Sequence, residues 1–272
     1  MTALATDLDS ASYGHFQRVV NRLTGLDLTA YRQGQMRRRL EVLRARVGAT
    51  DFIAYARLLE RDPQRVQELR DFLTINVTEF FRDTPHFRRL ATDVLPSLLA
   101  VRRSLRVWSA ACSVGAEPYS LAILLMELAP GGAHRIIATD VDRTALARAR
   151  RGDDYSAVEL RGVVPERLAR FFVPAAETST WALRPEVKRL VEFREQNLLI
   201  ESPGNAFDLI LCRNVVIYFT DEAKRALYER LTAALRPRGV LLLGATEVLP
   251  RPSALGLAVE GPSLYRRLSG QD

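Results

Sequence analysis

The sequence predicts an α/β protein with a doubly wound parallel sheet, preceded by a small all-helical domain. Three observations support this fold class. Strand and helix patterns alternate from Leu105 onward, no strand pattern precedes residue 75, and one buried strand runs through the small-residue turn 112–116 directly into a helix. Such a turn lets a ligand lie against the backbone at the carboxyl edge of the sheet.

The first 75 residues predict helices alone, because their apolar side chains recur at helical spacing. Phe16, Val19 and Val20 begin the pattern, and Met36, Leu40 and Leu43 continue it. Gly48 is expected to end the second helix and Asp51 to cap the third. We expect residues 1–80 to form a helical domain and residues 81–272 the α/β domain.

The alternating part predicts five parallel strands, at Arg106–Ala111, Arg135–Thr139, Val191–Gln196, Phe207–Cys212 and Gly239–Leu243. Helices are expected at Glu117–Leu128, Asp142–Arg150 and Asp221–Leu235. Residues 236–239, Arg-Pro-Arg-Gly, predict a turn, and Ser263–Leu268 a short strand at an antiparallel edge. The alternation of strand and helix patterns is interrupted over residues 155–190, which predicts an insertion with small β structure.

The turn and the next strand together predict a cofactor that carries a nucleoside. The second strand ends at Asp140, where a carboxylate can accept hydrogen bonds from a ribose diol. The turn has one glycine, Gly115, instead of the three that cradle a pyrophosphate, so a dinucleotide is disfavoured. Glu117 suits a cationic ligand such as S-adenosylmethionine, although the helix macrodipole explains an acid in a first turn equally well.

Composition excludes several classes of protein. The chain has 272 residues, 47% of them hydrophobic and 26% charged, which is typical of a soluble globular protein. It has no apolar run of ~20 residues and no basic segment near Met1, so we expect a cytoplasmic protein. Two cysteines and three scattered histidines predict neither a disulfide framework nor a metal site. The net charge of +7 favours acidic partners.

Two further polar stretches carry candidate site residues. Asn76, Thr78 and Arg82 lie in the apolar linker between the two domains, and an arginine beside a cleft can hold a carboxylate bidentately. Arg213 and Asn214 follow the fourth strand and are expected at the edge of the site, and so is Tyr218, which a packing role would explain if its motif stood alone.

These stretches resemble the CheR family of chemotaxis receptor methyltransferases. The matching segments occur in family order along nearly the whole chain: Asn76–Arg82, Trp108–Ser113 with Glu117–Ser120, Thr139–Asp142, Asn197–Leu199 and Cys212–Phe219. The resemblance implies a Rossmann-like class I methyltransferase fold, S-adenosylmethionine as cofactor, methylation of receptor glutamates to γ-methyl esters, and a helical domain that recognises the substrate. We expect a monomer that binds neither nucleic acid nor membrane.

The resemblance also assigns residues. The cofactor is expected to contact Asn76, Thr78, Arg82, Glu117, Asp140, Asn197, Leu198, Arg213 and Asn214, and the reacting glutamate Arg82 and Tyr218. The chain departs from the family where Ala116 stands in place of a first acid and Ala245 in place of a histidine, and its insertion is short. Two rival functions stay open, a non-catalytic cofactor-binding scaffold and, less favoured, a nucleic-acid methyltransferase.

A basic segment of the helical domain is the candidate receptor contact. Six arginines lie within fifteen residues, opposed only by Glu41: Arg32, Arg37, Arg38, Arg39, Arg44 and Arg46. Several can share one helical face, and a glutamate-rich receptor helix would be attracted to it. A solvated surface without a partner is the alternative.

Overall fold

The computed structural model describes residues 2–74, 76–175 and 179–269. By its contacts the chain divides into two compact units. The first comprises residues 1–75 with Tyr218–Lys224, and the second comprises Asn76–Ile217 with Arg225–Asp272. The short segment Tyr218–Lys224 lies inside the range that the sequence analysis gives to the α/β domain.

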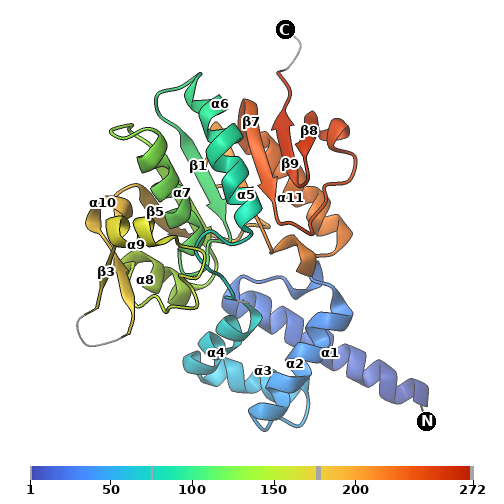
Figure 1. Cartoon of the computed structure of the whole chain (residues 1–272). Coiled ribbons are helices and arrows are strands. Elements are labelled where there is room, and N and C mark those ends of the chain that lie inside the picture. The colour runs from blue at the N-terminus through green and yellow to red at the C-terminus, as the bar shows by residue number, and fades with distance from the viewer. Residues whose placement is uncertain (1, 75, 176–178, 270–272) are drawn as a thin grey trace. The chain divides into compact units, whose positions relative to one another are not determined.

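The first unit is helical (Figure 1). Its elements are α1 (Thr2–Thr24), the 3-10 turn η1 (Leu28–Ala30), α2 (Gln33–Arg46), α3 (Phe52–Arg61) and α4 (Pro63–Leu73). The expected cap at Asp51 is confirmed, because its side chain accepts a hydrogen bond from the Ala54 N–H at 2.7 Å. An aromatic cluster of Tyr13, Phe16, Phe52 and Tyr55 fills the core.

The segment Tyr218–Lys224 is joined to this unit by backbone pairing. The Arg32 N–H donates to the Tyr218 carbonyl at 2.9 Å, and the Thr220 N–H donates to the Ala30 carbonyl at 2.8 Å. The rings of Tyr31 and Phe219 meet edge to face at 5.2 Å between centroids. The backbone of Tyr218 is therefore fixed to the start of α2.

The second unit contains the predicted sheet, in the order β5-β2-β1-β6-β7-β9-β8. Its parallel strands are β5 (Val191–Glu195), β2 (Arg135–Asp140), β1 (Arg106–Ala110), β6 (Phe207–Cys212) and β7 (Leu235–Leu243). The short strand predicted at Ser263–Leu268 is confirmed as β9 (Leu264–Arg267), which pairs antiparallel with β7, but it is not the edge strand of the sheet. A further strand that the sequence analysis misses, β8 (Leu257–Gly261), pairs with it.

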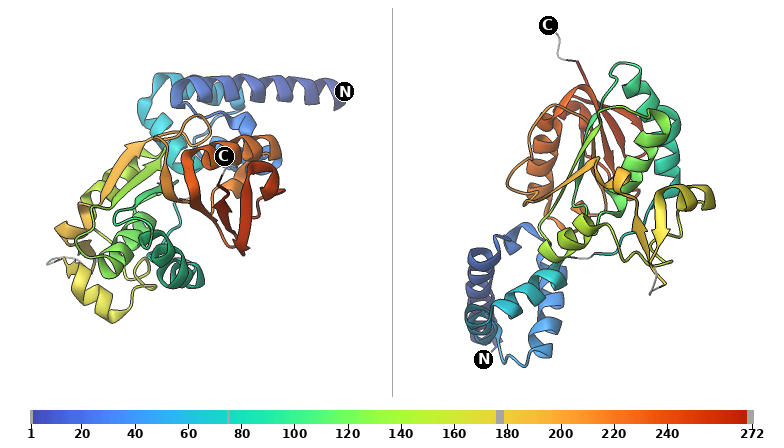
Figure 2. Two further views of the ribbon diagram at one scale, coloured as in Figure 1. Left: turned by 90° about the horizontal axis from the view of Figure 1, so that it is seen from above. Right: turned by 90° about the vertical axis from the view of Figure 1, so that its left-hand side faces the viewer.

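Helices cover both faces of the sheet, so the doubly wound prediction is confirmed. Figure 2 places α7 (Ala116–Leu128) and the helices before β1 on one face and α11 (Asp221–Ala234) on the other. Outside the insertion, the other helical elements are α5 (Thr84–Arg89), a π-helical turn η2 (Leu90–Val94), α6 (Leu95–Leu99), α8 (Arg143–Arg151), and the 3-10 turns η3 (Val216–Tyr218) and η4 (Pro252–Leu255).

The insertion holds a separate small sheet, as predicted. Strands β3 (Phe172–Pro174) and β4 (Trp181–Leu183) pair antiparallel, between α9 (Pro165–Phe171) and α10 (Pro185–Lys188). Residues 176–178 of the predicted insertion lie outside the described residues.

The prediction of a turn at residues 236–239 is wrong. These residues lie within β7, where the pairing with β6 jumps from Phe207–Leu235 to Leu209–Val240. Four residues of β7 therefore lie opposite one of β6, and Arg238 takes a left-handed backbone with φ 64°. The turn-forming residues therefore form a bulge within the strand.

Candidate functional site

The candidate site lies at the carboxyl edge of the parallel strands, where ligands of such sheets bind. Residues 111–115 follow β1, Val141 and Asp142 follow β2, and residues 196–198 follow β5. Residues 213–214 follow β6, and residues 244–247 follow β7. Because these strands run parallel, all five loops leave the sheet at the same edge. Every predicted cofactor residue except those of the segment 76–82 lies on or beside these loops.

Three residues of the loop after β1 have a left-handed backbone conformation. Ala111 has φ 62°, Ser113 has φ 50° and Gly115 has φ 89°. Such angles are uncommon for residues with a Cβ and are typically kept where function requires them. At Gly115 a Cβ would also lie 3.0 Å from the Tyr119 ring and 3.1 Å from the Ala149 methyl group, so only glycine fits there.

Asp140 ties this loop to the end of β2. Its carboxylate accepts hydrogen bonds from the Ser113 N–H at 2.8 Å and from the Asp142 N–H at 2.9 Å, one at each oxygen. Each oxygen keeps a further acceptor position for a ligand. Burial raises the pKa of Asp140, and the backbone N–H groups oppose that rise. The turn and the carboxylate that the sequence predicts separately are thus hydrogen-bonded to each other.

Asn76 connects the same two loops. Its amide nitrogen donates to the Asp142 carboxylate at 2.6 Å, and its amide oxygen accepts from the Ser113 hydroxyl at 2.8 Å. The other oxygen of Asp142 caps α8 by accepting from the Ala145 N–H. Asn76 therefore joins the two loops, and its cofactor contact expected from the resemblance stays a prediction.

The buried side chain of Arg213 is the centre of a charge network. Its guanidinium, with its side chain 2% exposed, lies 3.2 Å from Glu117 and 2.7 Å from Asp83, and it donates to the Arg82 carbonyl at 2.9 Å. Glu117 also accepts from the Ser109 hydroxyl at 2.7 Å. Burial raises the pKa of Glu117, and Arg213 opposes that rise. The Nε of Arg213 is buried without a partner.

The segment that carries Arg82 is strained on both sides. Phe81 has φ 55° and Asp83 has φ 58°, and a left-handed aromatic residue is rare. The Arg82 guanidinium donates to the Val77 carbonyl at 2.7 Å. Thr78, between them, is half-buried. Strain on either side of a half-buried arginine favours a functional position for it over a packing role.

The loop after β5 carries Asn197 and Leu198. The Asn197 side chain accepts from the Leu199 N–H at 3.0 Å, and Leu198 is buried. Gln196, just before them, donates its own N–H to the Asp140 carbonyl at 2.9 Å. Its side-chain nitrogen is buried without a partner, an unused donor beside the predicted cofactor residues.

Glu247 is a site residue that sequence reasoning misses. Its buried carboxylate accepts three backbone N–H groups, from Asn214 at 2.9 Å, Val216 at 3.0 Å and Gly244 at 2.8 Å. It thereby joins the loops after β6 and β7 and holds Asn214 at φ 58°. The sequence offered one signal for this residue. Glu247 is the acid at the end of the segment Gly244–Glu247, in which the sequence analysis noted only that Ala245 stands in place of a histidine.

The side chains at this edge fit S-adenosylmethionine better than a phosphate-bearing ligand. The buried carboxylate of Asp140 and the half-buried carboxylate of Glu117 line the loops, and a carboxylate favours a sulfonium or an ammonium group over an anion. The unpartnered buried donors of Gln196 and Arg213 leave hydrogen bonds for a polar ligand to complete.

The remaining predicted residues belong to the first unit. Arg38 and Arg46 are exposed on α2, and Arg32, which precedes α2, is exposed too. Arg37, Arg39 and Arg44 are half-buried and contact their own unit. Arg37 pairs with Glu41 at 3.2 Å, Arg39 donates to the Phe72 carbonyl, and Arg44 donates to the Ala49 carbonyl at 3.1 Å. Tyr218 is half-buried.

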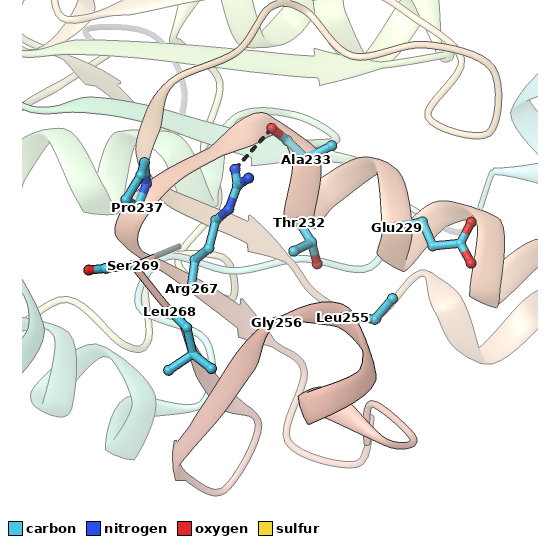
Figure 3. Close-up of a pocket in the computed structure, with 9 residues that line it drawn as sticks. All are labelled: Glu229, Thr232, Ala233, Pro237, Leu255, Gly256, Arg267, Leu268 and Ser269. Carbon is cyan, nitrogen blue, oxygen red and sulfur yellow. Dashed lines mark hydrogen bonds between the residues drawn. The ribbon is translucent and has the colours of Figure 1, made fainter. Parts of the chain in front are cut away.

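A cavity of about 410 Å³ lies elsewhere in the second unit (Figure 3). It is lined from the end of α11, from Pro237 in the amino-terminal half of β7, and from Arg267 and Leu268. Arg267 donates to the Ala233 carbonyl at 3.2 Å and so satisfies the end of α11. The cavity lies near the amino end of β7, so it is separate from the loops described above.

Comparison with known proteins agrees with this site. Residues 76–259 match the family model described as the CheR methyltransferase SAM-binding domain. Residues 11–74 match the CheR methyltransferase all-alpha domain. Residues 76–259 thus form the domain of a methyltransferase that uses S-adenosylmethionine.

Three curated relatives are each named chemotaxis protein methyltransferase. That of Listeria innocua is 39% identical over 93% of this chain and 96% of its own length. That of Vibrio parahaemolyticus is 38% identical over 92% of both chains, and one from Pseudomonas aeruginosa is 35% identical over 88% of this chain and 91% of its own. The chain belongs to the CheR methyltransferase family. Among the residues the structure describes, none of the helices has the length and apolarity to cross a membrane.

Proposed function

We propose that this protein methylates glutamate side chains of chemoreceptor cytoplasmic helices, forming γ-methyl esters. The observation that carries the proposal is the carboxyl-edge arrangement, in which Arg82 lies in a strained segment that Arg213 links to Glu117. The chemotaxis methyltransferases to which the chain is similar supply the substrate class.

The proposed cofactor contacts are Asp140 with the ribose diol, Glu117 with a cationic part of the cofactor, and Asn197 and Leu198, whose contacting group is not assigned. Asn76 and Arg213 hold these groups in place. Thr78 and Asn214 are the other residues proposed to surround the cofactor. When bound there, S-adenosylmethionine supplies a methyl group activated by a sulfonium leaving group.

The chain's task is then to position and desolvate the substrate carboxylate. A glutamate with a pKa of ~4.3 is already ionised at neutral pH, so no general base is needed. Arg82 orients that carboxylate, and Tyr218 donates a hydrogen bond to its second oxygen. An arginine that paired both oxygens tightly would weaken the nucleophile, so the proposed role of Arg82 is orientation.

The test is methyl transfer from labelled S-adenosylmethionine to receptor-containing membranes, followed by treatment with base. A γ-methyl ester releases labelled methanol, which is the expected result. Methylated nucleic acid keeps its label under base, and a non-catalytic scaffold transfers none, so either outcome would replace the proposal by one of the rival functions.

A further inference from the structure

Asp83 is half-buried and belongs to the charge network around Arg213, a role that no sequence motif had assigned. Its carboxylate lies 2.7 Å from the Arg213 guanidinium, whereas Glu117 lies 3.2 Å from the same group. Arg213 is thus shared by two acids, and Asp83 makes the shorter contact. Burial and Arg213 lower the pKa of nearby His86, so this histidine adds no positive charge at neutral pH.

The charges of the cofactor and of its product differ by one. S-adenosylmethionine carries a sulfonium, an ammonium and a carboxylate, for a net charge of +1. S-adenosylhomocysteine has lost the methyl group with the sulfonium charge and is neutral overall. Any residue that makes the site more negative therefore favours the cofactor over the product.

We propose that Asp83 is a positioning residue that takes up the charge of Arg213 and leaves the Glu117 carboxylate available to the cationic cofactor. The proposal rests on the proposed role of Glu117. One arginine between two carboxylates leaves the network with a net negative charge, and without Asp83 the remaining pair of Arg213 and Glu117 is neutral. Removal of the Asp83 charge therefore weakens the site's electrostatic preference for S-adenosylmethionine over S-adenosylhomocysteine.

The substitution Asp83→Asn isolates the charge. Asp83 has φ 58° and precedes α5 without a side-chain cap hydrogen bond. Asparagine adopts this left-handed conformation as readily as aspartate, and its amide oxygen still accepts from Arg213. The backbone and the arginine are thus expected to keep their places while one negative charge is removed.

The experiment is calorimetric titration of the full chain with S-adenosylmethionine and, separately, with S-adenosylhomocysteine. Asp83→Asn is expected to weaken cofactor binding by roughly three- to tenfold and product binding less. The effect is kept modest because the Asp83 side chain is 34% exposed and partly screened. Asp83→Glu, which keeps the charge, is expected to restore most of the preference.

The matched control is Asp93→Asn, which removes the same charge from an exposed aspartate of η2 that pairs with Arg89 at 3.8 Å. It is expected to leave both affinities unchanged. Equal losses for the two ligands in Asp83→Asn would reveal a merely structural role and overturn the inference, as would no loss at all. If the wild type binds both ligands but labels no receptor, the proposed substrate fails while this test of Asp83 still stands.

Discussion

Asp140 is the residue with the most direct predicted effect on the cofactor. Asp140→Ala removes a charged acceptor of the ribose hydroxyls, and hydrogen bonds to charged groups contribute roughly 1.5–3 kcal/mol. We expect S-adenosylhomocysteine to bind about 10- to 150-fold more weakly in calorimetric titration. Circular dichroism must show an intact fold, because Asp140 also holds Ser113. Unchanged affinity in the folded variant would remove Asp140 from the site.

The pH dependence of binding follows from the same carboxylate. Burial raises the pKa of Asp140, so it takes up a proton at a higher pH than an exposed aspartate does. The raised pKa stabilises the fold in acid, and that contribution is lost as the pH rises through it. Cofactor binding needs the ionised form and is therefore expected to weaken as the pH falls through the raised pKa. Affinity that stays constant down to the pKa of a free aspartate would contradict this.

Arg82 and Tyr218 are expected to act on the substrate more than on the cofactor. Arg82→Ala and Tyr218→Phe should each lower kcat by a larger factor than they lower cofactor affinity, because each loses a contact with the substrate carboxylate. Steady-state kinetics with a receptor substrate, set beside calorimetric titration, separates the two effects. If either variant keeps the wild-type kcat, the substituted residue does not act on the substrate and has only a packing role.

Residue types at strand ends made part of this site predictable. Asp140 and Glu117 follow a strand and a turn in a pattern with a known physical purpose. Asp83 and Glu247 were missed because their partners are distant in sequence: Asp83 pairs with Arg213, and Glu247 accepts N–H groups from the loop after β6. Only the fold brings such pairs together.

At the scale of elements, the loop after β1 is expected to tolerate no Cβ at Gly115. Gly115→Ala combines φ 89° with contacts of 3.0–3.1 Å to Tyr119 and Ala149. We expect a loss of about 1–3 kcal/mol in the free energy of unfolding, measured by denaturant titration, together with weaker cofactor binding. Gly131→Ala is the matched control, since Gly131 has φ 81° with nothing within 4 Å of the added Cβ. Equal losses in both variants would mean that the close packing contributes nothing.

The basic helix α2 allows a sharper test than reversal of neighbouring arginines. Arg39 and Arg44 contact their own unit, so their loss would disturb the fold. Arg38 and Arg46 are exposed, and we expect Arg38→Glu with Arg46→Glu to abolish receptor methylation and leave cofactor affinity intact. Methylation in the wild type should also weaken as salt is raised.

The control for this prediction reverses Arg57 and Arg61, which are exposed on α3. These variants change the net charge by the same amount on another helix of the unit. Receptor methylation that survives reversal on α2, or fails equally on both helices, would show that α2 is no specific docking surface.

The elements themselves were predictable wherever side-chain pattern and turn chemistry agreed. Strands β1, β2 and β6 were predicted because each is a short, mostly buried run. The turn at residues 236–239 failed because a proline and a glycine can also occupy a bulge inside a strand. Strand β8 was missed because its exposed Val259 and its glycine weaken the alternating pattern.

At the scale of the whole molecule, the division into units differs from a simple break along the chain. Tyr218–Lys224 contacts the helical unit although the chain on both sides of it belongs to the α/β unit. Hydrogen bonds between residues 30–32 and 218–220 attach this segment to the helical unit. No local sequence pattern predicts a pairing between residues so far apart in the chain. The proposed catalytic Tyr218 thus belongs, by its contacts, to the unit that carries the proposed receptor contact.

The measurement that tests the central claim most directly is identification of the methylated atom. A chemoreceptor cytoplasmic domain is incubated with the protein and S-adenosylmethionine, then digested and sequenced by tandem mass spectrometry. The account predicts added methyl groups on glutamate side chains, removed by mild base and strongly reduced with Asp140→Ala at limiting cofactor concentration. Methyl groups on lysine, arginine or another base-stable site would contradict it, as would an unmodified receptor under conditions where the wild-type protein binds the cofactor.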